Sequence, residues 1–356
     1  MSHQKLFFIY PGELDTRTGG YRYDKRIIEA LRSGTKSAQP WHVTLVSLEG
    51  SYPFPTSAQL ATAAAQLEAI DDHSLVVMDG LAYSTMPDVI AAHSSRLTII
   101  ALIHHPLALE TGLDSEQASQ LKALETRALH FARHIITTSE LTADSLAAYN
   151  VPAHKVTAVL PGTDNAAIAQ GSGSNVANLL CVATLTQRKG HSVLLDALAT
   201  IPHLPWHLNC VGSTERDISH YKAVLEQRTR LMLDERVSFT GELEDEQLDQ
   251  YYGEADVFVL ASFHEGYGMV LSEAIARGLP IVCTNAGAMS QTVPVGAGIL
   301  VPPDAHEALA EAISQILTSE QLMEDLKRTA TSARENLRSW QTAANEFSEL
   351  LTMTQR

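Results

Sequence analysis

Short apolar runs alternate along this chain with segments in which apolar residues recur at helical spacing. Apolar runs bounded by polar or glycine-containing turns are typical of buried strands, and the periodic segments are typical of amphipathic helices. The predicted strands lie near residues 5–10, 42–47, 75–78, 97–103, 134–137 and 156–160, and then near 178–183, 206–211, 236–239, 256–260, 280–283 and 298–300. The predicted helices cover 22–33, 57–70, 115–132 and 140–149, and then 189–199, 217–230, 245–253, 268–277 and 305–317. This rhythm predicts an α/β protein with two parallel sheets joined by crossover helices.

The chain of 356 residues is longer than one ordinary hydrophobic core requires, so it suits two domains. The small, polar segment 166–175 is the predicted linker. We therefore expect a first domain over residues 1–165 and a second over residues 166–335. The last helical stretch, about 320–354, is longer than the second domain needs. We expect residues 336–356 to reach back to the first domain.

The chain is acidic, and most of the excess lies in its second half. A content of 45% apolar and 19% charged residues is that of a globular protein. The net charge of −16 argues against nucleic acid as a partner, because a nucleic-acid binder needs a basic face. Residues 1–165 carry 12 Lys/Arg and 17 Asp/Glu, a net of −5, and the remainder carries 13 and 24, a net of −11. Peripheral membrane contact, if there is any, therefore belongs to the N-terminal domain, where Arg22, Lys25 and Arg26 lie close together.

The cysteines and the N-terminal segment indicate a cytoplasmic protein. Cys181, Cys210 and Cys283 lie in apolar runs and form no CxxC pair, so we predict buried thiols in a reducing compartment. The apolar run 6–10 is too short for a signal peptide, and no segment approaches the length of a membrane span. We predict a cytoplasmic location, with association at the cytoplasmic face of a membrane left open.

Two glutamates, Glu265 and Glu273, stand eight residues apart around a predicted helix start. The apolar run 257–260 ends in a polar turn with two glycines, a helix follows, and Gly278 and Pro280 end it. Both glutamates can then face one pocket, beside backbone N–H groups that attract phosphate. Carboxylates there can accept hydrogen bonds from sugar or ribose hydroxyls. The alternative is a helix-dipole partner and a solvated side chain.

A Gly-Gly turn follows the first predicted strand. Gly19 and Gly20 precede the helix at 22–33, and glycines there let the backbone approach a phosphate group. The turn lacks the GxGxxG fingerprint, so nothing in it supports nicotinamide dinucleotide binding. A plain turn is the alternative interpretation.

Two adjacent histidines, His104 and His105, follow the strand at 97–103, at the end of a strand where the ligand pockets of open α/β sheets lie. Either ring can hydrogen-bond a sugar or contact an acceptor, and the alternative is a structural histidine at a strand end. The spacing to Glu110 matches no metal-ligand pattern, and no DxD-type carboxylate pair follows a strand. We therefore predict no metal site and no cofactor.

Two basic residues, Arg188 and Lys189, follow the first strand of the second half. They lie at a predicted helix start beside backbone N–H groups, an arrangement suited to a diphosphate. In so acidic a half, this uncompensated basic pair favours a binding role over a solvated pair of charges. Glycines after two further strands, Gly212 and Gly241, also let the backbone approach a ligand.

Together these motifs resemble the retaining glycosyltransferases of family four, which have the GT-B fold. The resemblance covers nearly the whole chain and is strongest over about 178–304. It rests on residues 183–191, 237–241 and 251–280, where the family's Glu-x7-Glu signature falls on Glu265 and Glu273. It implies two Rossmann-like, doubly wound domains that face each other across a cleft, with a C-terminal helix that crosses back to the first domain.

The resemblance also implies which residues form the site. The catalytic candidates are Glu265, His104, His105, Arg188 and Lys189. The donor-binding candidates are Gly19, Gly20, Gly212, Leu243, Glu265, Gly266, Tyr267, Gly268, Met269, Val270 and Glu273.

Each candidate takes a role from the family. Glu273 would hold the ribose hydroxyls, and Glu265 with the backbone of residues 266–270 would hold the transferred sugar. Arg188 and Lys189 would neutralise the diphosphate leaving group.

The remaining candidates would surround the donor in the same way. Gly19 and Gly20 would approach the phosphates, the backbone near Leu243 would touch the nucleobase, and His104 or His105 would lie near the reacting face of the sugar.

The implied activity is that of a retaining, metal-independent hexosyltransferase. It would move a hexosyl group from a nucleotide-diphosphate sugar, UDP in preference to GDP, to a hydroxyl acceptor in polysaccharide, lipopolysaccharide or glycoconjugate synthesis. The acceptor would be a saccharide or a lipid-linked saccharide. A sugar-nucleotide epimerase on a similar fold and a non-catalytic sugar-nucleotide-binding partner are the alternatives.

Three positions depart from the family pattern. The Gly-Arg that usually ends the first strand of the second domain is Ala183-Thr184, so one expected cation is absent there. The usual Pro-Asn-Gly is Pro161-Gly162, and a usual glutamate aligns with Gln291. Whether Arg188 replaces the missing arginine is left open.

Overall fold

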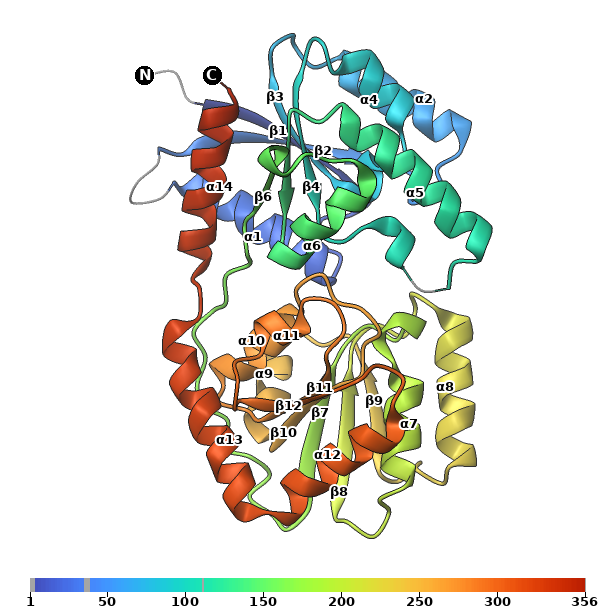
Figure 1. The fold of residues 1–356 in the computed structure, drawn as a ribbon, viewed down its shortest axis with the longest axis vertical. Coiled ribbons are helices and arrows are strands. Elements are labelled where there is room, and N and C mark those ends of the chain that lie inside the picture. The colour runs from blue at the N-terminus through green and yellow to red at the C-terminus, as the bar shows by residue number, and fades with distance from the viewer. Residues whose placement is uncertain (1–3, 35–38, 111, 356) are drawn as a thin grey trace. The chain divides into compact units, whose positions relative to one another are not determined.

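The computed structural model describes residues 4–34, 39–110 and 112–355 (Figure 1). The chain forms two compact units. Unit 1 consists of Met1–Gly162 and Arg338–Arg356, and unit 2 consists of Thr163–Leu337. The chain therefore passes between the units at residues 162–163 and 337–338, where the sequence placed boundaries after residues 165 and 335.

Unit 1 is built on a parallel sheet of six strands in the order β2-β1-β3-β4-β5-β6. The strands are β1 (Gln4–Pro11), β2 (Trp41–Leu48), β3 (Leu75–Asp79), β4 (Thr98–Ile103), β5 (His134–Thr137) and β6 (Val156–Ala158). Every residue of β3 is buried, and so is every residue of β4 except Thr98. Helices cover both faces of such strands, which is why these two read as continuous apolar runs in the sequence.

The helices of unit 1 lie in two layers. They are α1 (Gly19–Ser33), α2 (Ser57–Glu68), α3 (Gly80–Tyr83), α4 (Pro87–His93), α5 (Ser115–His130), α6 (Glu140–Ser145) and α14 (Trp340–Thr354). Figure 1 shows α1 and α14 on one face of the sheet and α2, α4 and α5 on the other. The short helices α3 and α4 were not predicted, because neither is long enough to display a helical period.

Helix α14 packs on unit 1, although its sequence follows unit 2. The indole Nε1 of Trp41 donates a hydrogen bond to the Ser348 hydroxyl at 2.8 Å, and the Trp340 ring lies edge-on to Tyr23 with centroids 5.9 Å apart. The helical stretch predicted over 320–354 is therefore two helices. Ser339 separates them, because its hydroxyl caps α14 by accepting a hydrogen bond from the Thr342 N–H at 3.1 Å.

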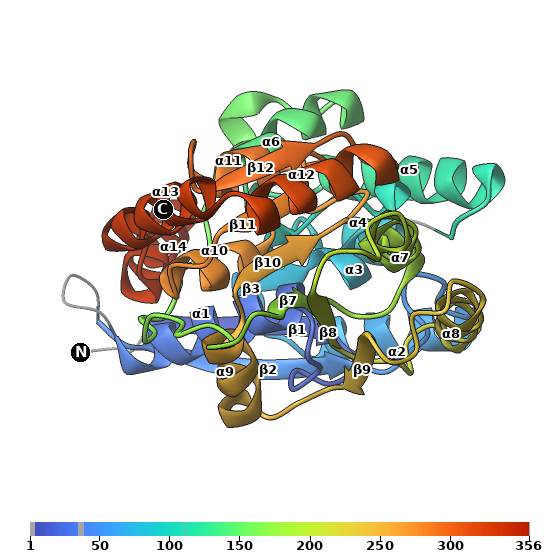
Figure 2. The ribbon, with the colours of Figure 1, turned by 90° about the horizontal axis from the view of Figure 1, so that it is seen from below.

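Unit 2 repeats the architecture with a parallel sheet in the order β12-β11-β10-β7-β8-β9. Its strands are β7 (Ala177–Val182), β8 (Trp206–Val211), β9 (Val237–Gly241), β10 (Val257–Leu260), β11 (Ile281–Thr284) and β12 (Gly298–Val301). Its helices are α7 (His191–Ala199), α8 (Ile218–Arg230), α9 (Asp245–Glu254), α10 (Met269–Ala276), α11 (Met289–Thr292), α12 (His306–Thr318) and α13 (Glu320–Ala333). Figure 2 shows α7, α8 and α12 on one face of this sheet and α9 and α10 on the other.

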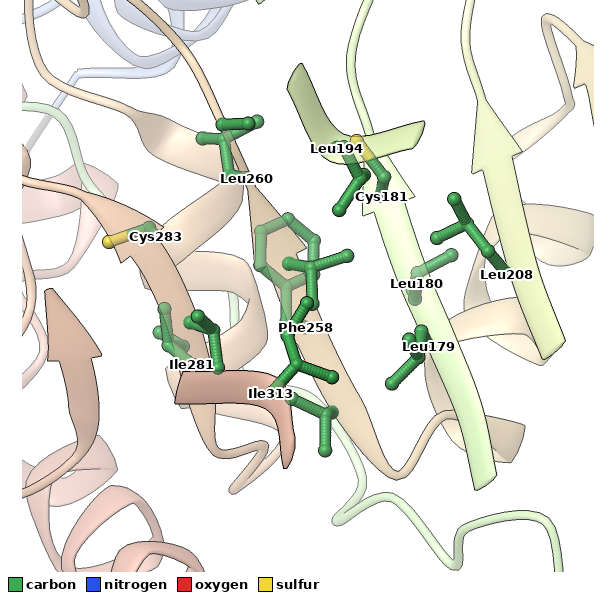
Figure 3. Close-up of a cluster of buried hydrophobic side chains, with 14 of the residues drawn as sticks. Leu179, Leu180, Cys181, Leu194, Leu208, Phe258, Leu260, Ile281, Cys283 and Ile313 are labelled. Carbon is green, nitrogen blue, oxygen red and sulfur yellow. The ribbon is translucent and has the colours of Figure 1, made fainter. Parts of the chain in front are cut away.

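The core of unit 2 is formed by residues of neighbouring strands and of the helices that cover them (Figure 3). Leu179 and Leu180 of β7, Phe258 of β10 and Ile281 of β11 are at most 1% exposed, and Ile313 of α12 packs over the same cluster. Each predicted strand overlaps an observed one, so the expected α/β fold with two parallel sheets is confirmed.

The prediction of a linker at residues 166–175 is wrong, because this segment is a packed part of unit 2. The Ala169 N–H donates to the Arg277 carbonyl at 2.9 Å, and the Gln170 N–H donates to the Gly253 carbonyl at 2.8 Å. These backbone hydrogen bonds tie the segment to α9 and to the residue that follows α10.

Two expectations concern burial and membrane crossing. All three cysteines are buried free thiols, as predicted. Within the described ranges, no helix has both the length and the apolar character needed to cross a membrane.

Candidate functional site

The candidate residues of unit 2 come from loops that follow neighbouring strands. Lys189 ends a 3₁₀ turn, Gln187–Lys189, that follows β7, and Glu265 lies in the loop after β10. Strands β7 and β10 pair in the sheet. Since parallel strands end at the same edge of a sheet, these two loops lie next to each other although 76 residues separate them.

Glu265 is buried among the two basic residues of the first loop. Its Oε1 accepts hydrogen bonds from Lys189 Nζ at 2.6 Å and from the Ser262 hydroxyl at 2.7 Å, and its Oε2 lies 3.6 Å from Arg188 Nη1. Arg188 also donates to the His264 carbonyl at 2.7 Å. The sequence suggested that Arg188 and Lys189 have no counter-ion, and this is wrong, because Glu265 is their counter-ion.

The electrostatics of this cluster keep Glu265 ionised. Burial raises the pKa of the carboxyl, but the charges of Lys189 and Arg188, with the hydrogen bonds that the carboxylate accepts, outweigh burial and lower the pKa to about 2. Two cations and one anion leave a net charge of +1 in an otherwise acidic half of the chain. The cluster is therefore suited to bind an anion, and Glu265 is suited to accept hydrogen bonds.

Two glycines let the loops approach each other. Gly190 has a φ of +67°, and a Cβ there would lie less than 3.0 Å from the Ala261 carbonyl oxygen. Gly287 has a φ of +63°, and a Cβ there would lie less than 3.0 Å from the Glu265 carbonyl oxygen. Sequence reasoning missed Gly287 and Ser262 as parts of the site, because glycine and serine in loops are too common to mark one.

Glu273 lies in α10 and has its own partners. It is 8% exposed, and the Tyr252 hydroxyl donates to its Oε2 at 3.1 Å. The Arg277 guanidinium lies over the Tyr252 ring, 4.2 Å from the centroid, and donates to the Glu273 carbonyl at 2.9 Å. The two signature glutamates thus sit in different surroundings, Glu265 beside cations and Glu273 beside a phenol.

The turn before α10 contains a residue in the left-handed region, as its glycines suggest. Gly268 has a φ of +84° and is the N-cap of α10, which begins at Met269. The Thr292 hydroxyl donates to the Tyr267 carbonyl at 2.6 Å and holds the turn from the side of α11. Backbone N–H groups of this turn, over residues 266–270, belong to a helix start of the kind that binds anions.

The other two donor-site candidates of unit 2 have structural surroundings of their own. Gly212 has a φ of +150°, and a Cβ there would lie less than 3.0 Å from the Ala183 carbonyl oxygen, so a glycine is needed for the ends of β7 and β8 to pack. Leu243 is half-buried and packs against the core of unit 2.

In unit 1, Gly19 and Gly20 do not form the turn that was predicted before the helix. Helix α1 begins at Gly19, so both are its first residues. A Cβ on Gly20 would lie 3.1 Å from His104 Cδ2, whereas one on Gly19 would meet nothing within 4 Å. Position 20 therefore favours a glycine because the His104 ring lies close to it.

The two histidines have different partners. His104 Nε2 lies 3.1 Å from Asp24 Oδ1 and 3.2 Å from Asp79 Oδ2, and His105 Nε2 lies 3.2 Å from Glu110 Oε2. Asp24 and Asp79 are buried residues that sequence reasoning missed.

A signal for each missed carboxylate was present in the sequence. Asp24 falls on the buried stripe of α1, with Tyr23, Ile27 and Ile28, and Asp79 ends a strand that is otherwise apolar. A carboxylate in either position needs a partner.

Two groups of described residues have donor atoms close enough to hold a metal ion. They are Asp24, Asp79 and His104 in unit 1, and Cys181, His191 and Cys210 in unit 2. Every donor atom of a group lies within 4.8 Å of the others. The expectation that the reaction needs no metal therefore stays a prediction.

Comparisons with known proteins give a family match and a fold match. Residues 165–333 match the family model described as "Glycosyl transferases group 1". A D-inositol 3-phosphate glycosyltransferase of Corynebacterium urealyticum is 28% identical over 235 residues, which are 61% of this chain and 55% of that protein. A mannosylfructose-phosphate synthase of Agrobacterium fabrum is 28% identical over 180 residues, 49% of this chain and 40% of that protein. The chain thus spans about half the length of these two relatives.

Solved structures resemble the whole chain. A sucrose-phosphate synthase of Thermosynechococcus elongatus has a TM-score of 0.83 at 22% identity and covers 99% of both chains. The Anabaena protein Alr3699/HepE in complex with UDP-glucose has a TM-score of 0.78 at 19% identity and covers 99% of this chain and 100% of its own. At these identities the likeness shows the fold.

Proposed function

We propose that this chain, whose second unit is a group 1 glycosyltransferase domain on a GT-B fold, is a retaining hexosyltransferase. Its donor would be a nucleotide-diphosphate sugar, UDP in preference to GDP. Its acceptor would be a hydroxyl group of a saccharide or a lipid-linked saccharide, in polysaccharide, lipopolysaccharide or glycoconjugate synthesis. The observation that carries the proposal is the pair of cations, Lys189 and Arg188, around the buried Glu265 at the strand ends of unit 2.

The cluster supplies the charge that the proposed reaction needs. Cleavage of the bond between the sugar and the diphosphate leaves negative charge on a phosphate oxygen. Lys189 and Arg188, held in place by Glu265, would stabilise that charge without moving. Because the arginine expected at Thr184 is absent, Arg188 is the cation that would take its place.

The ionised Glu265 fits a donor-holding role. A carboxyl whose pKa is about 2 has no proton to give at neutral pH, so it is unsuited to be a general acid. As an anion it can accept hydrogen bonds from sugar hydroxyls. The two fixed cations also take the role that a divalent ion has in other diphosphate sites, which supports a reaction that proceeds without metal.

One observation supports UDP as the nucleotide, and another explains why membrane contact is not part of the proposal. The similar structure of Alr3699/HepE was solved with UDP-glucose. In α1, Lys25 pairs with Asp15 at 2.6 Å, and the Arg26 guanidinium lies over the Trp340 ring. These two basic side chains have intramolecular roles, so they do not by themselves indicate a membrane surface.

A donor screen tests the proposed function. Among UDP-, GDP- and ADP-glucose, the UDP sugar is expected to bind most tightly and therefore to raise the melting temperature most. A ligand at 100 times its Kd stabilises the folded state by about 2.7 kcal/mol. Transfer with an acceptor should persist in EDTA, and NMR of the product should show the anomeric configuration of the donor. Activity that is lost in EDTA and restored by Mg²⁺ would contradict the metal-free reaction. An epimer formed from donor alone would indicate an epimerase.

Replacing Glu273 with alanine is expected to weaken nucleotide binding by about 1–3 kcal/mol, the range for a charge-assisted hydrogen bond. The buried carboxylate, held by Tyr252, would otherwise accept hydrogen bonds from the ribose hydroxyls. Calorimetric titration with UDP measures the effect. Glu226→Ala, an exposed position on α8, is the matched control and should bind as the parent does. Unchanged affinity in Glu273→Ala would remove this residue from the donor site.

A further inference from the structure

Two helices of unit 2, α9 and α10, hold the Glu273 side chain between them, and both cover the same face of the sheet (Figure 2). Asp249 and Tyr252 stand three residues apart on α9. Glu273 lies on α10, and Arg277 is the C-cap of this helix, four residues further on. Residues at these spacings share one face of a helix, so each helix contributes a pair of side chains. The pairs meet, because Tyr252 bonds Glu273 and the Arg277 guanidinium forms an ion pair with Asp249.

The phenol ring of Tyr252 has a fixed position. The residue is 0% exposed, and its ring stacks on Phe258 of β10 with centroids 6.0 Å apart and an angle of 10° between the planes. The Arg277 guanidinium lies over the same ring, 4.2 Å from the centroid. Because the core residue and the guanidinium both contact the ring, the hydroxyl group is held at one place.

The Tyr252 hydroxyl has two acceptors within reach. The carboxylate oxygen Oε2 of Glu273 is 3.1 Å away, and the Val270 carbonyl oxygen is 3.5 Å away. The hydroxyl has a single proton, and the closer acceptor, which belongs to an acidic side chain, forms the stronger bond. The positive charge of Arg277 over the ring polarises the phenol and makes it a better donor.

This bond limits the motion of the Glu273 carboxylate. The last torsion of a glutamate side chain is broad, so a carboxylate without a fixed partner takes many orientations. Ordering such a side chain when a ligand binds costs free energy, and a group that is ordered beforehand avoids this cost. A carboxylate can accept about four hydrogen bonds, so the bond from Tyr252 is compatible with further bonds from ribose hydroxyls.

We propose that Tyr252 is a positioning residue that fixes the Glu273 carboxylate to accept hydrogen bonds from the ribose hydroxyls of the nucleotide, and that Arg277 supports the phenol in this role. The proposal rests on the proposed function, since the ribose belongs to the donor named there. It has a specific consequence, because the contribution of Tyr252 exists only for a nucleotide that carries ribose hydroxyls. A purely structural tyrosine would affect the binding of every nucleotide alike.

Tyr252→Phe keeps the ring and removes only the hydroxyl group. We expect the variant to raise the Kd of UDP about three- to tenfold and to leave the Kd of 2′,3′-dideoxy-UDP within about twofold of the parent's value. Calorimetric titration measures both, and the guanosine pair replaces the uridine pair if the donor screen favours GDP. In steady-state transfer, KM for the donor should rise while kcat stays near the parent's value, as expected for loss of a binding interaction.

Tyr83→Phe is the matched control. It removes the hydroxyl of another buried tyrosine, which lies in unit 1 and donates to the Ala128 carbonyl at 2.7 Å. This variant should bind both nucleotides as the parent does. Arg277→Met, which keeps an apolar side chain over the ring, should weaken UDP binding with the same selectivity as Tyr252→Phe and by a smaller factor. A Tyr252→Phe variant that weakens both nucleotides equally, or neither, would overturn the proposal and leave the proposed function standing.

A second measurement does not depend on nucleotide binding. Urea unfolding of Tyr252→Phe, Glu273→Met and the double variant gives the coupling between the two side chains. We expect the two effects to be non-additive, and additive effects would refute the contact on which the proposal depends. If the parent binds neither UDP nor GDP, the proposed function fails and this proposal fails with it. That outcome differs from a parent that binds UDP while Tyr252→Phe shows no selectivity, where the positioning role alone is refuted.

Discussion

Replacing Lys189 with methionine is expected to lower kcat/KM by at least about 100-fold and to lower the free energy of unfolding by about 3 kcal/mol. Methionine keeps much of the length of the side chain and removes only the ammonium group. Glu265, which is 7% exposed, would lose its hydrogen bond of 2.6 Å from Nζ. It would keep the hydrogen bond from the Ser262 hydroxyl, but its remaining counter-ion in the cluster would be the more distant guanidinium of Arg188. An anion buried without its main counter-ion is the physical cause of the instability, and loss of a cation beside the diphosphate is the cause of the lower rate.

A second variant separates the two effects. In Lys189→Met/Glu265→Gln both members of the pair are neutral, so most of the lost stability should return, while transfer should stay low. Urea unfolding and steady-state kinetics measure the two quantities. Lys222→Met, at an exposed position on α8, is the matched control and should leave both near the parent's values. A Lys189→Met enzyme with parental kcat/KM would exclude this residue from the reaction.

The stability of this ion pair also depends on pH. The folded-state pKa of Glu265 is below its unfolded value of 4.5. Its contribution is therefore present above pH 4.5 and is lost as the pH falls toward 2. The destabilisation by Lys189→Met should accordingly shrink in acid.

Replacing Gly190 with alanine is expected to lower stability or transfer as much as Lys189→Met does, although it removes no charge. A Cβ at this position would lie less than 3.0 Å from the backbone carbonyl oxygen of Ala261, and the φ of +67° is itself unfavourable for alanine. The Phe263 N–H donates to the Arg188 carbonyl at 2.8 Å, so the turn is tied to the loop of Glu265. The new methyl group would push the two loops apart and move Lys189 away from Glu265.

We expect Gly190→Ala to lose at least about 3 kcal/mol of unfolding free energy, or to lose transfer at least about 100-fold where it folds. Gly253→Ala makes the same change in the last turn of α9, where a Cβ would meet nothing within 4 Å. That control should keep the parent's stability or gain up to about 0.5–1 kcal/mol, the difference between alanine and glycine in a helix. Equal stability of the two variants would show that the loops do not need the close approach at position 190.

The predictions for Lys189→Met and Gly190→Ala concern the same arrangement, in which the Glu265 carboxylate holds two cations in place. Its partners lie on loops after β7 and β10, and the fold alone makes those loops neighbours. The ionised Glu265 and the phenol-bonded Glu273 then differ in what they can do. Glu265, whose pKa is lowered to about 2, has no proton to donate at neutral pH, which agrees with a role in holding a donor.

Much of the fold could be predicted because its signals are local. Buried parallel strands are short apolar runs, and amphipathic helices show their own period, so β3, β4 and α12 were found near their true bounds. The failures are also physical. Helices α3 and α4 are too short to show a period, and the segment 166–175 has the composition of a linker, yet backbone hydrogen bonds pack it onto unit 2.

The sequence by itself determined the order of strands and helices, the eight-residue spacing of Glu265 and Glu273, and the glycines that allow a turn before α10, because each depends on neighbours in the chain. Only the tertiary structure decided which charged groups meet. Lys189 and Glu265 are 76 residues apart, and His104 and Asp24 are 80 apart. These pairs form because the order of the parallel strands, set by packing of the whole sheet, brings distant loops to a common edge, and no local pattern carries that information.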